Sequence, residues 1–249
     1  MSTLDWLVAK PIAHRGLHDK ANGIIENTIT AADAAIAGGF GIECDVQLTS
    51  DGEAAVFHDF VLECLTGQSG DVRARKASEL TGIGLSGSKS DTIPLLSAFL
   101  DRIGGRVPLV VEIKSRYDGD MTLTRRTCEV LSTYSGPVVI KSFDPAIVAE
   151  VRRIAPTVPR GIVAESTHTD KGYGSLTPEQ RHALGNLLHI EESQPQFISW
   201  RVKDLPTAAP FLARHLGRLP VMAWTVRTPE DRERAAKHAD QMVFEGFRP

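Results

Sequence analysis

The sequence has few cysteines, little net charge and no long apolar stretch, and each shortage excludes a class of protein. Cys44, Cys64 and Cys128 are an odd and widely spaced set, which is neither a disulfide framework nor a metal-binding motif. A formal net charge of -3 lacks the basic excess of nucleic-acid-binding domains. No stretch of about 18 apolar residues is present to span a membrane, so stable membrane insertion is not expected.

The first ten residues have no basic start followed by a long apolar run, so they do not resemble a signal peptide. We therefore expect a cytoplasmic protein with reduced thiols. Hydrophobic residues make up 42% of the 249 residues and charged residues 24%, which suits one large core. A length of 249 residues matches that of one α/β barrel.

Short apolar runs alternate with segments whose apolar residues recur at helical spacing. The runs are Pro11–His14, Phe40–Gln47, Glu53–His58, Val107–Lys114, Pro137–Ser142, Val158–Ala164, Gln196–Trp200, Leu219–Val226 and Gln241–Phe244. The helical segments are Glu26–Ala37, Leu95–Ile103, Met121–Thr133, Pro145–Ile154, Thr177–Ile190, Thr207–Leu216 and Pro229–Ala239. Strand–helix alternation predicts parallel strands, and about eight of them favour a single TIM (β/α)8 barrel over an open doubly wound sheet.

The alternation is interrupted once and stops early. Val46–Ser50 and Glu53–His58 flank an Asp-Gly pair, which predicts a hairpin. Residues 59–92 then form a Gly- and Ser-rich insertion of the kind that often serves as a functional loop. No helix-like segment follows Phe244. Leu4, Trp6 and Leu7 or a second subunit could cover that flank, so a homo-oligomer is possible. We expect the whole chain, 1–249, to form one catalytic domain.

Ionisable residues stand where the apolar runs end. His14-Arg15, Glu43 with Asp45, His58-Asp59, Glu112 with Lys114, and Lys141 all occupy such positions. Burying an unpaired charge is costly, so this recurrence calls for an explanation. In a barrel, the carboxyl ends of the strands form the rim that carries the active site.

Side chains two apart on a strand share a face, so Glu43 and Asp45 point one way and Cys44 points toward the helices. Glu112 and Lys114 share a face on a neighbouring strand. Three converging carboxylates suit one hard divalent cation, Mg²⁺ or Ca²⁺, with Mn²⁺ also possible. The alternative is that Glu43 and Asp45 only form salt bridges at the rim.

His14 and His58 are candidates for the general acid and base, because histidine exchanges protons near neutrality. Arg15 offers a fork that matches phosphate oxygens. The remaining histidines end no apolar run beside other candidates, so we interpret them as structural or surface groups: His18, His168, His182, His189, His215 and His238.

Two further features have both a structural and a functional interpretation. Glu26-Asn27-Thr28 opens a helix, where Asn27 or Thr28 could simply cap it. A site role is about equally attractive for Asn27 and less so for Glu26. Trp224 ends the eighth apolar run as either a core aromatic or an apolar wall against the alcohol part of a substrate.

Taken in order, these motifs resemble the glycerophosphodiester phosphodiesterase family. The matching stretches are His14-Arg15-Gly16, Glu26-Asn27-Thr28, Ile42 to Gly52 with Phe57-His58-Asp59, Glu112-Ile113-Lys114, Ser142 to Pro145, and Trp224-Thr225-Val226. Departures from the family pattern are Cys64 where Arg is usual, Arg227 where Asn is usual, and Phe244 to Pro249 in place of Thr-Asp-Arg-Pro. These departures bear on which head group the substrate carries. The positions of the metal ligands and of the two histidines still match the family pattern.

The resemblance implies a TIM barrel that hydrolyses small-molecule glycerophosphodiesters to an alcohol and sn-glycerol 3-phosphate. It implies that Glu43, Asp45 and Glu112 bind the metal, that His14 and His58 are catalytic, and that Arg15 and Lys114 bind phosphate. It also matches residues 59–92 to an insertion that caps the pocket. The attacking group could be water or the neighbouring glycerol hydroxyl. Alternatives are a phospholipase of the same barrel type and an inactive barrel that binds a phosphorylated ligand.

Overall fold

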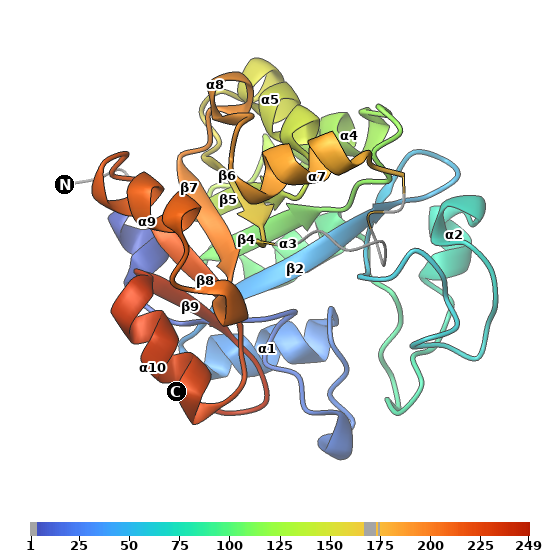
Figure 1. Ribbon diagram of the computed structural model, residues 1–249. Helices are drawn as coiled ribbons and strands as arrows, with labels where there is room; N and C mark the ends of the chain where they lie inside the picture. The colour runs from blue at the N-terminus through green and yellow to red at the C-terminus, as the bar shows by residue number, and fades with distance from the viewer. Residues whose placement is uncertain (1–3, 167–172, 174) are drawn as a thin grey trace.

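A computed structural model describes residues 4–166, 173 and 175–249 of the chain, and within them eight parallel strands close into a barrel (Figure 1). β1 pairs with β2 on one side and β9 on the other, which completes the ring. The closed barrel confirms the expected fold and excludes the open doubly wound sheet. The strands are β1 (Ile12–Ala13), β2 (Gly41–Leu48), β4 (Leu109–Ile113), β5 (Val138–Ser142), β6 (Arg160–Ala164), β7 (Phe197–Arg201), β8 (Val221–Val226) and β9 (Gln241–Phe244).

Helices follow all of the barrel strands except the last and pack around the outside of the ring (Figure 1). They are α1 (Ile29–Gly38), α3 (Leu96–Ile103), α4 (Thr122–Leu131), α5 (Pro145–Ile154), α7 (Pro178–Gly185), α8 (Ile190–Ser193), α9 (Ala208–His215) and α10 (Pro229–His238). Local residues set several of their starts: Thr28 caps α1, and Asp144 followed by Pro145 begins α5. All the sequence-predicted runs and helical segments contain an observed element.

Each strand buries both faces, because one faces the helices and the other faces the barrel interior. Cys44 and Val111 join the large outer core, as the alternation predicts. The lower interior is an apolar layer of Ile12, Val110, Val139, Phe197, Met222 and Val243. Gly161 makes room for it, since a Cβ there would lie 2.4 Å from the Phe197 ring. The next inward positions along the strands are mostly ionisable.

The N-terminal segment closes the bottom of the barrel. The short 3-10 helix η1 (Asp5–Val8) places Leu4 and Leu7 in the apolar cluster of the barrel interior. Gln241, the first residue of β9, donates hydrogen bonds to the carbonyls of Leu7 and Lys10 at 2.8 and 2.7 Å. These leucines therefore plug the amino ends of the strands. They do not cover the flank beside β9, where the sequence had suggested them, because that flank lies outside the ring.

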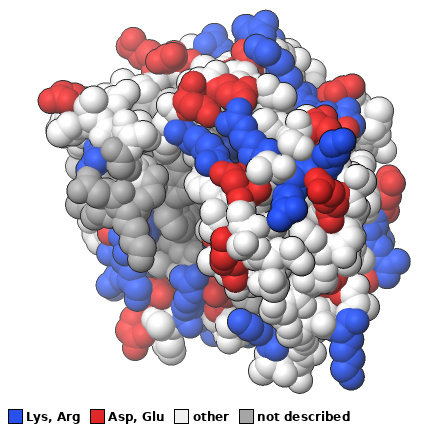
Figure 2. All heavy atoms as spheres, turned by 90° about the vertical axis from the view of Figure 1, so that its right-hand side faces the viewer, with Lys and Arg blue, Asp and Glu red and all other residues white. Residues whose placement is uncertain are grey.

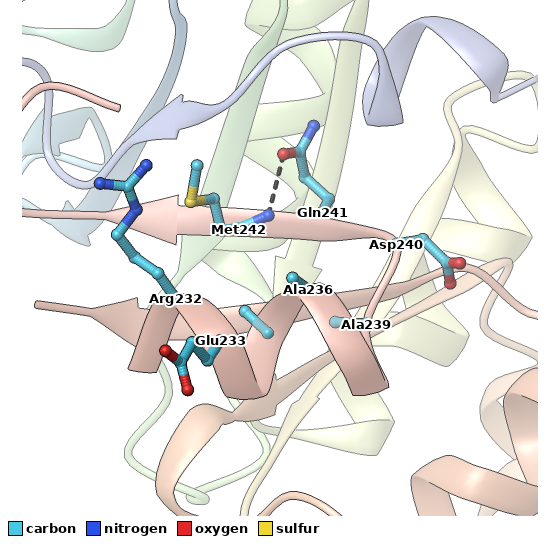
Figure 3. Close-up of a pocket in the computed structure, with 8 residues that line it drawn as sticks. Arg232, Glu233, Ala236, Ala239, Asp240, Gln241 and Met242 are labelled. Carbon is cyan, nitrogen blue, oxygen red and sulfur yellow. Dashed lines mark hydrogen bonds between the residues drawn. The ribbon is translucent and has the colours of Figure 1, made fainter. Parts of the chain in front are cut away.

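Residues 245–249, which follow β9, form no helix, and part of the flank is instead covered by aromatic rings. Phe244 packs edge-on against Phe40, with ring centroids 5.1 Å apart, and tilted against Phe247 at 5.5 Å. A hollow of about 500 Å³ remains between α10 and β9 (Figure 3), lined in part by Ala236, Ala239 and Met242. Small side chains on α10 therefore leave the space that a further helix would fill.

The predicted hairpin and insertion are both present. β3 (Ala54–Val56) pairs antiparallel with the end of β2, and the chain then passes through η3 (Val72–Ala74) and α2 (Ala77–Leu80). This part has a small apolar core of its own around Phe57, Leu62 and Leu80. Basic and acidic side chains are interspersed on the face that carries α2 (Figure 2).

Three ion pairs tie the insertion to the loop between β4 and α4. Arg73 pairs with Asp118 at 2.9 Å and also with Asp120, while Arg116 pairs with Asp71 at 2.6 Å. The Arg116 guanidinium also lies 4.6 Å from the centre of the Phe60 ring. The insertion is thus held beside the carboxyl ends of β2 and β4. Within the described residues, no helix is both long and apolar enough to cross a membrane.

Candidate active site

The ionisable layer of the barrel lies directly above its apolar layer, at the carboxyl ends of the first strands. Asp45 on β2 is the register partner of Glu112 on β4, which is in turn the partner of Lys141 on β5. Glu43 lies one inward position below Asp45, and all four side chains are buried. The inward parity expected for Glu43, Asp45 and Glu112 is therefore what brings the side chains together.

The three carboxylates form a compact donor set. One oxygen from each of Glu43, Asp45 and Glu112 lies within 4.8 Å of the others. Oxygen ligands about 2.0–2.6 Å from a Mg²⁺ or Ca²⁺ ion are at most about 4–5 Å apart, so these residues fit such an ion. The donor set is all oxygen, which favours a hard divalent cation over a soft one.

Three cationic side chains contact these carboxylates within the described residues. Lys114 Nζ lies 2.8 Å from Asp45 Oδ1 and also contacts Glu112 Oε1. Lys141 Nζ lies 3.0 Å from both Glu43 Oε1 and Glu112 Oε2. Arg15 Nε lies 3.3 Å from Asp45 Oδ2. Three negative charges are therefore opposed by three positive ones.

The electrostatics keep the carboxylates ionised despite their burial. Burial raises the pKa of Glu112, but Lys114 and Lys141 outweigh it and lower that pKa to about 2. Burial likewise opposes ionisation of Asp45, and the nearby charges of Lys114, His58 and Arg15 hold its pKa well below the ordinary value. Acceptor-only carboxylates are the form that binds a cation.

A strained turn after β1 aims Arg15 at the same place. Arg15 and Asn27 both have left-handed backbones, with φ of 56° and 57°, and Asn27 N donates to the Arg15 carbonyl at 2.9 Å. Arg15 N donates to Glu43 Oε2 at 3.0 Å, and its guanidinium pairs with Glu26 at 2.6 Å. Gly16 lets α1 approach, because a Cβ there would lie 2.8 Å from the Ala31 Cβ.

Asn27 contacts a carboxylate of the triad, and Thr28 caps the helix. Asn27 Nδ2 donates to Asp45 Oδ2 at 3.0 Å, while Asp45 N donates to Asn27 Oδ1 at 3.1 Å. Thr28 Oγ1 accepts from Ala31 N at the start of α1. The sequence leaves open whether these residues cap the helix or belong to the site. Thr28 caps the helix, and Asn27 contacts the site. Asn27 fixes the rotamer of Asp45 within the barrel.

His14 follows β1 and His58 follows β3, and each ring lies beside an acid. His14 Nδ1 lies 2.7 Å from Glu245 Oε2, and its Nε2 is 4.0 Å from Glu43 Oε2. His58 Nδ1 lies 2.7 Å from Asp59 Oδ1. In each case a carboxylate at Nδ1 leaves Nε2 available for proton exchange. This pairing is the arrangement expected of a general acid or base.

A cavity of about 500 Å³ opens beside the triad and reaches it at Glu112. Its lining includes His58, Glu112 and Lys114 together with the aromatic residues Tyr117, Phe143, Tyr173 and Trp224. Phe143 and Trp224 stack edge to face at 5.4 Å, and Trp224 Nε1 donates to the Ser199 carbonyl at 2.9 Å. Trp224 therefore presents an apolar face to the cavity while its polar atom is satisfied below.

The sequence does not identify two of the site residues. It places Lys141 at a strand end without indicating a role, and it shows Glu245 only as part of a departure from a family motif. Lys141 carries a usable signal, since a lysine inside an apolar strand needs an acidic partner. Glu245 has no local signal, because its contact with His14 spans 231 residues and depends on barrel closure.

Of the other histidines, His18 lies near His14, whereas His182, His189 and His215 contact residues on the helical side. His18 is half-buried near His14, Arg15 and Glu26, and desolvation lowers its pKa. His182 and His189 contact Asn186 and Ser193 on the helical side, and His215 packs on Phe211. His168 lies outside the described residues. Within the part of the chain that the structure describes, His18, His182, His189 and His215 do not line the cavity.

Comparison with known proteins agrees with this geometry. Residues 14–244 match the model of the glycerophosphoryl diester phosphodiesterase family. YhdW of Bacillus subtilis (strain 168) is 28% identical over 223 residues, covering 80% of this chain and 88% of the relative. The glycerophosphodiester phosphodiesterase of Caldanaerobacter subterraneus subsp. tengcongensis is 33% identical over 161 residues, or 61% of this chain and 65% of that protein.

A solved structure shares the fold. The Oleispira antarctica phosphodiesterase, determined with its product sn-glycerol-3-phosphate, superposes with a TM-score of 0.77 at 20% identity. The match covers 96% of this chain and 93% of the other. At this identity the likeness concerns the barrel alone.

Proposed function

The chain belongs to the glycerophosphoryl diester phosphodiesterase family, and we propose that it cleaves glycerophosphodiesters to an alcohol and sn-glycerol 3-phosphate with the help of one divalent cation. The convergence of Glu43, Asp45 and Glu112 beside two acid-paired histidines is the observation that carries this proposal. Product binding by the Oleispira antarctica phosphodiesterase supports the choice of product.

In this proposal, Glu43, Asp45 and Glu112 would hold the cation, which when bound would supply positive charge to stabilise the phosphate in the transition state. Lys114 lines the cavity and Arg15 contacts Asp45, so both are placed to bind the remaining phosphate oxygens. Arg15 suits this task because its planar fork matches two oxygens at once. Asn27 keeps Asp45 oriented during binding.

The two histidines divide the proton transfers. His58 lines the same cavity as the aromatic rings, so we assign it protonation of the leaving alcohol. His14 is buried beside Glu43, so we assign it deprotonation of the attacking hydroxyl, whether from water or from the glycerol itself. Glu245 and Asp59 orient the two rings through their contacts with Nδ1.

The cavity favours a small, water-soluble substrate. Trp224 and its aromatic neighbours offer an apolar wall to the alcohol part, as the sequence suggested for Trp224. The adjoining hollow is lined by Arg73, Arg116, Asp118 and Asp120. Charged side chains beside the site suit a hydrated head group better than lipid tails. We therefore favour glycerophosphodiesters over the phospholipid substrates of related barrels.

The experiment is release of glycerol 3-phosphate from glycerophosphocholine by the purified protein, with EDTA, Mg²⁺, Mn²⁺ and Ca²⁺ in parallel. We expect release that EDTA abolishes and one of the cations restores. A parallel assay with phosphatidylinositol in vesicles tests the phospholipid alternative. Release from neither substrate with any cation would contradict the proposal, and EDTA-resistant release would remove the cation from it.

A further inference from the structure

Two lysines contact the carboxylate triad, but from different sides. Lys114 lines the cavity, and 12% of its side chain is exposed. Lys141 does not line the cavity, and only 3% of its side chain is exposed. Lys141 stands on β5 above the apolar layer formed by residues such as Val139, the inward position below it on the same strand. Lys141 therefore contacts the triad from the buried interior of the barrel and not from the cavity.

Lys141 contacts one oxygen on each of two acids. Its Nζ lies 3.0 Å from Glu43 Oε1 and 3.0 Å from Glu112 Oε2, so it bridges β2 and β4. Glu43 Oε2 accepts from Arg15 N, and Glu112 Oε1 contacts Lys114 instead. On each acid, the oxygen that Lys141 does not contact is therefore the one that contacts Arg15 or Lys114.

Without a counter-ion this arrangement would be unfavourable. Glu43 and Glu112 are almost fully buried, and like charges in a low-dielectric interior repel strongly. A divalent cation could offset that repulsion only while bound. Lys141 is covalently part of the barrel, so its charge is present whether the cation is bound or not.

We propose that Lys141 is a positioning residue, a fixed internal counter-ion that keeps the carboxylate triad assembled in the metal-free protein. It makes folding of the barrel independent of the cation. It also adds positive charge beside the ion's position, which weakens cation binding and keeps the ion exchangeable. This inference rests on the proposed use of the triad as a cation site.

The test compares Lys141→Met with Lys114→Met, which removes the same charge from the cavity side of Glu112. Thermal unfolding is measured in EDTA and in saturating Mn²⁺, and Mn²⁺ affinity is measured by calorimetry. For Lys141→Met we expect a lower Tm in EDTA, a larger Mn²⁺-induced rise in Tm than in wild type, and Mn²⁺ binding tightened roughly tenfold or more. Lys114→Met should lower the Tm in EDTA by less.

A structural role in packing would lower the Tm equally with and without Mn²⁺, and that result would overturn the inference. So would weaker Mn²⁺ binding by Lys141→Met. If this variant does not fold in EDTA, the double variant Glu43→Gln/Lys141→Met decides. Removing both charges should restore folding, and failure to do so would again contradict a counter-ion role. If wild type binds no divalent cation, the proposed metal site fails, while the EDTA comparison still tests Lys141 itself.

Discussion

At the scale of single residues, the two histidines differ in exposure more than in partners. His14 is 8% exposed and hydrogen-bonded to Glu245, whereas His58 lines the cavity and is hydrogen-bonded to Asp59. The same carboxylate-to-Nδ1 contact therefore serves a buried ring and an accessible one. In the proposed mechanism, this difference separates the two proton transfers spatially, and the choice of leaving group tests it.

We expect His14→Ala and His58→Ala each to lower kcat by roughly 10²–10⁴-fold, because each removes a proton-transfer group. With a p-nitrophenyl phosphodiester, whose leaving group needs no proton, His58→Ala should recover most of its rate and His14→Ala should not. His215→Ala, on α9, is the control and should match wild type. Equal rescue of both site variants would contradict the assigned roles.

Glu245 predicts a pH dependence of stability. Burial opposes its ionisation, but hydrogen bonds to His14 and Arg227 outweigh this and lower its pKa to about 2. The folded-state pKa lies below the unfolded value, so this contribution to stability is present above about pH 4.5 and disappears as pH falls toward 2.

Glu245→Gln should therefore be less stable than wild type at pH 7, with the difference shrinking toward pH 2. Urea unfolding at several pH values measures it. Glu179→Gln, on the exposed surface of α7, provides the matched change without a histidine partner. A pH-independent difference for Glu245→Gln would show that its charge is not what stabilises the barrel.

Residue by residue, sequence reasoning succeeds where a rule acts locally. Strand parity places Glu43 and Asp45 together and sends Cys44 to the helix layer, because side chains alternate regardless of tertiary context. It does not find the pairing of His14 with Glu245, which is created by the β1–β9 contact. Asn27 is intermediate: its position before a helix is visible, but its contact with Asp45 needs the strained turn at Arg15.

At the scale of elements, the insertion and the loop after β4 act as one unit held by charge. Arg73 and Arg116 make the ion pairs to Asp118, Asp120 and Asp71, and all of these side chains are partly exposed. Such pairs each contribute only about 0–1 kcal/mol to stability and weaken with salt. Loss of these pairs should therefore disorder the rim of the site more than it lowers the free energy of unfolding.

Arg73→Gln should raise KM a few-fold at low salt and leave Tm within about 1–2 °C of wild type, because the pairs are partly exposed. Adding salt should raise the wild-type KM toward that of the variant. Arg102→Gln, which loses an exposed pair with Asp33 away from the rim, is the control. A KM equal to wild type at low salt would mean that the ion pairs do not order the rim.

Element prediction fails where backbone geometry interrupts a good periodicity. The Thr177–Ile190 segment carries helical spacing, but α7 ends at Gly185 and a separate short α8 begins at Ile190. A Cβ at Gly185 would lie 2.8 Å from the Ser166 carbonyl oxygen, so the helix end packs against a loop. Leu187 then takes φ of 56°, which an α-helix does not allow. Hydrophobic spacing contains no information about this contact.

At the scale of the whole molecule, the two ends of the barrel are closed by different means. The carboxyl end carries the ionisable layer and cavity, whereas the amino end is plugged by Leu4 and Leu7 of the N-terminal segment. The sequence predicted the closed barrel from strand count. It could not place these leucines, because amphipathic segments of this length fit several apolar surfaces.

Leu7→Ala should destabilise the protein by about 2–5 kcal/mol, because Leu7 is fully buried and its loss leaves a cavity under the barrel. That corresponds to a fall in Tm of roughly 5–15 °C. Activity at low temperature should be retained, since the site lies at the other end. Leu188→Ala, at a largely exposed position, is the control. An unchanged Tm for Leu7→Ala would show that the plug is not part of the stable core.

The closure of β1 onto β9 has a consequence for biosynthesis. β1 emerges first from the ribosome but must wait for β9, and His14 must wait for Glu245, 231 positions later. At about 5–20 residues per second, that delay is roughly 10–50 s. Throughout it, the nascent sheet has an unpaired edge, and His14 lacks its carboxylate partner. The proposed site is therefore complete only once β9 and Glu245 have been synthesised, and a chain terminated before them would be inactive and prone to aggregation.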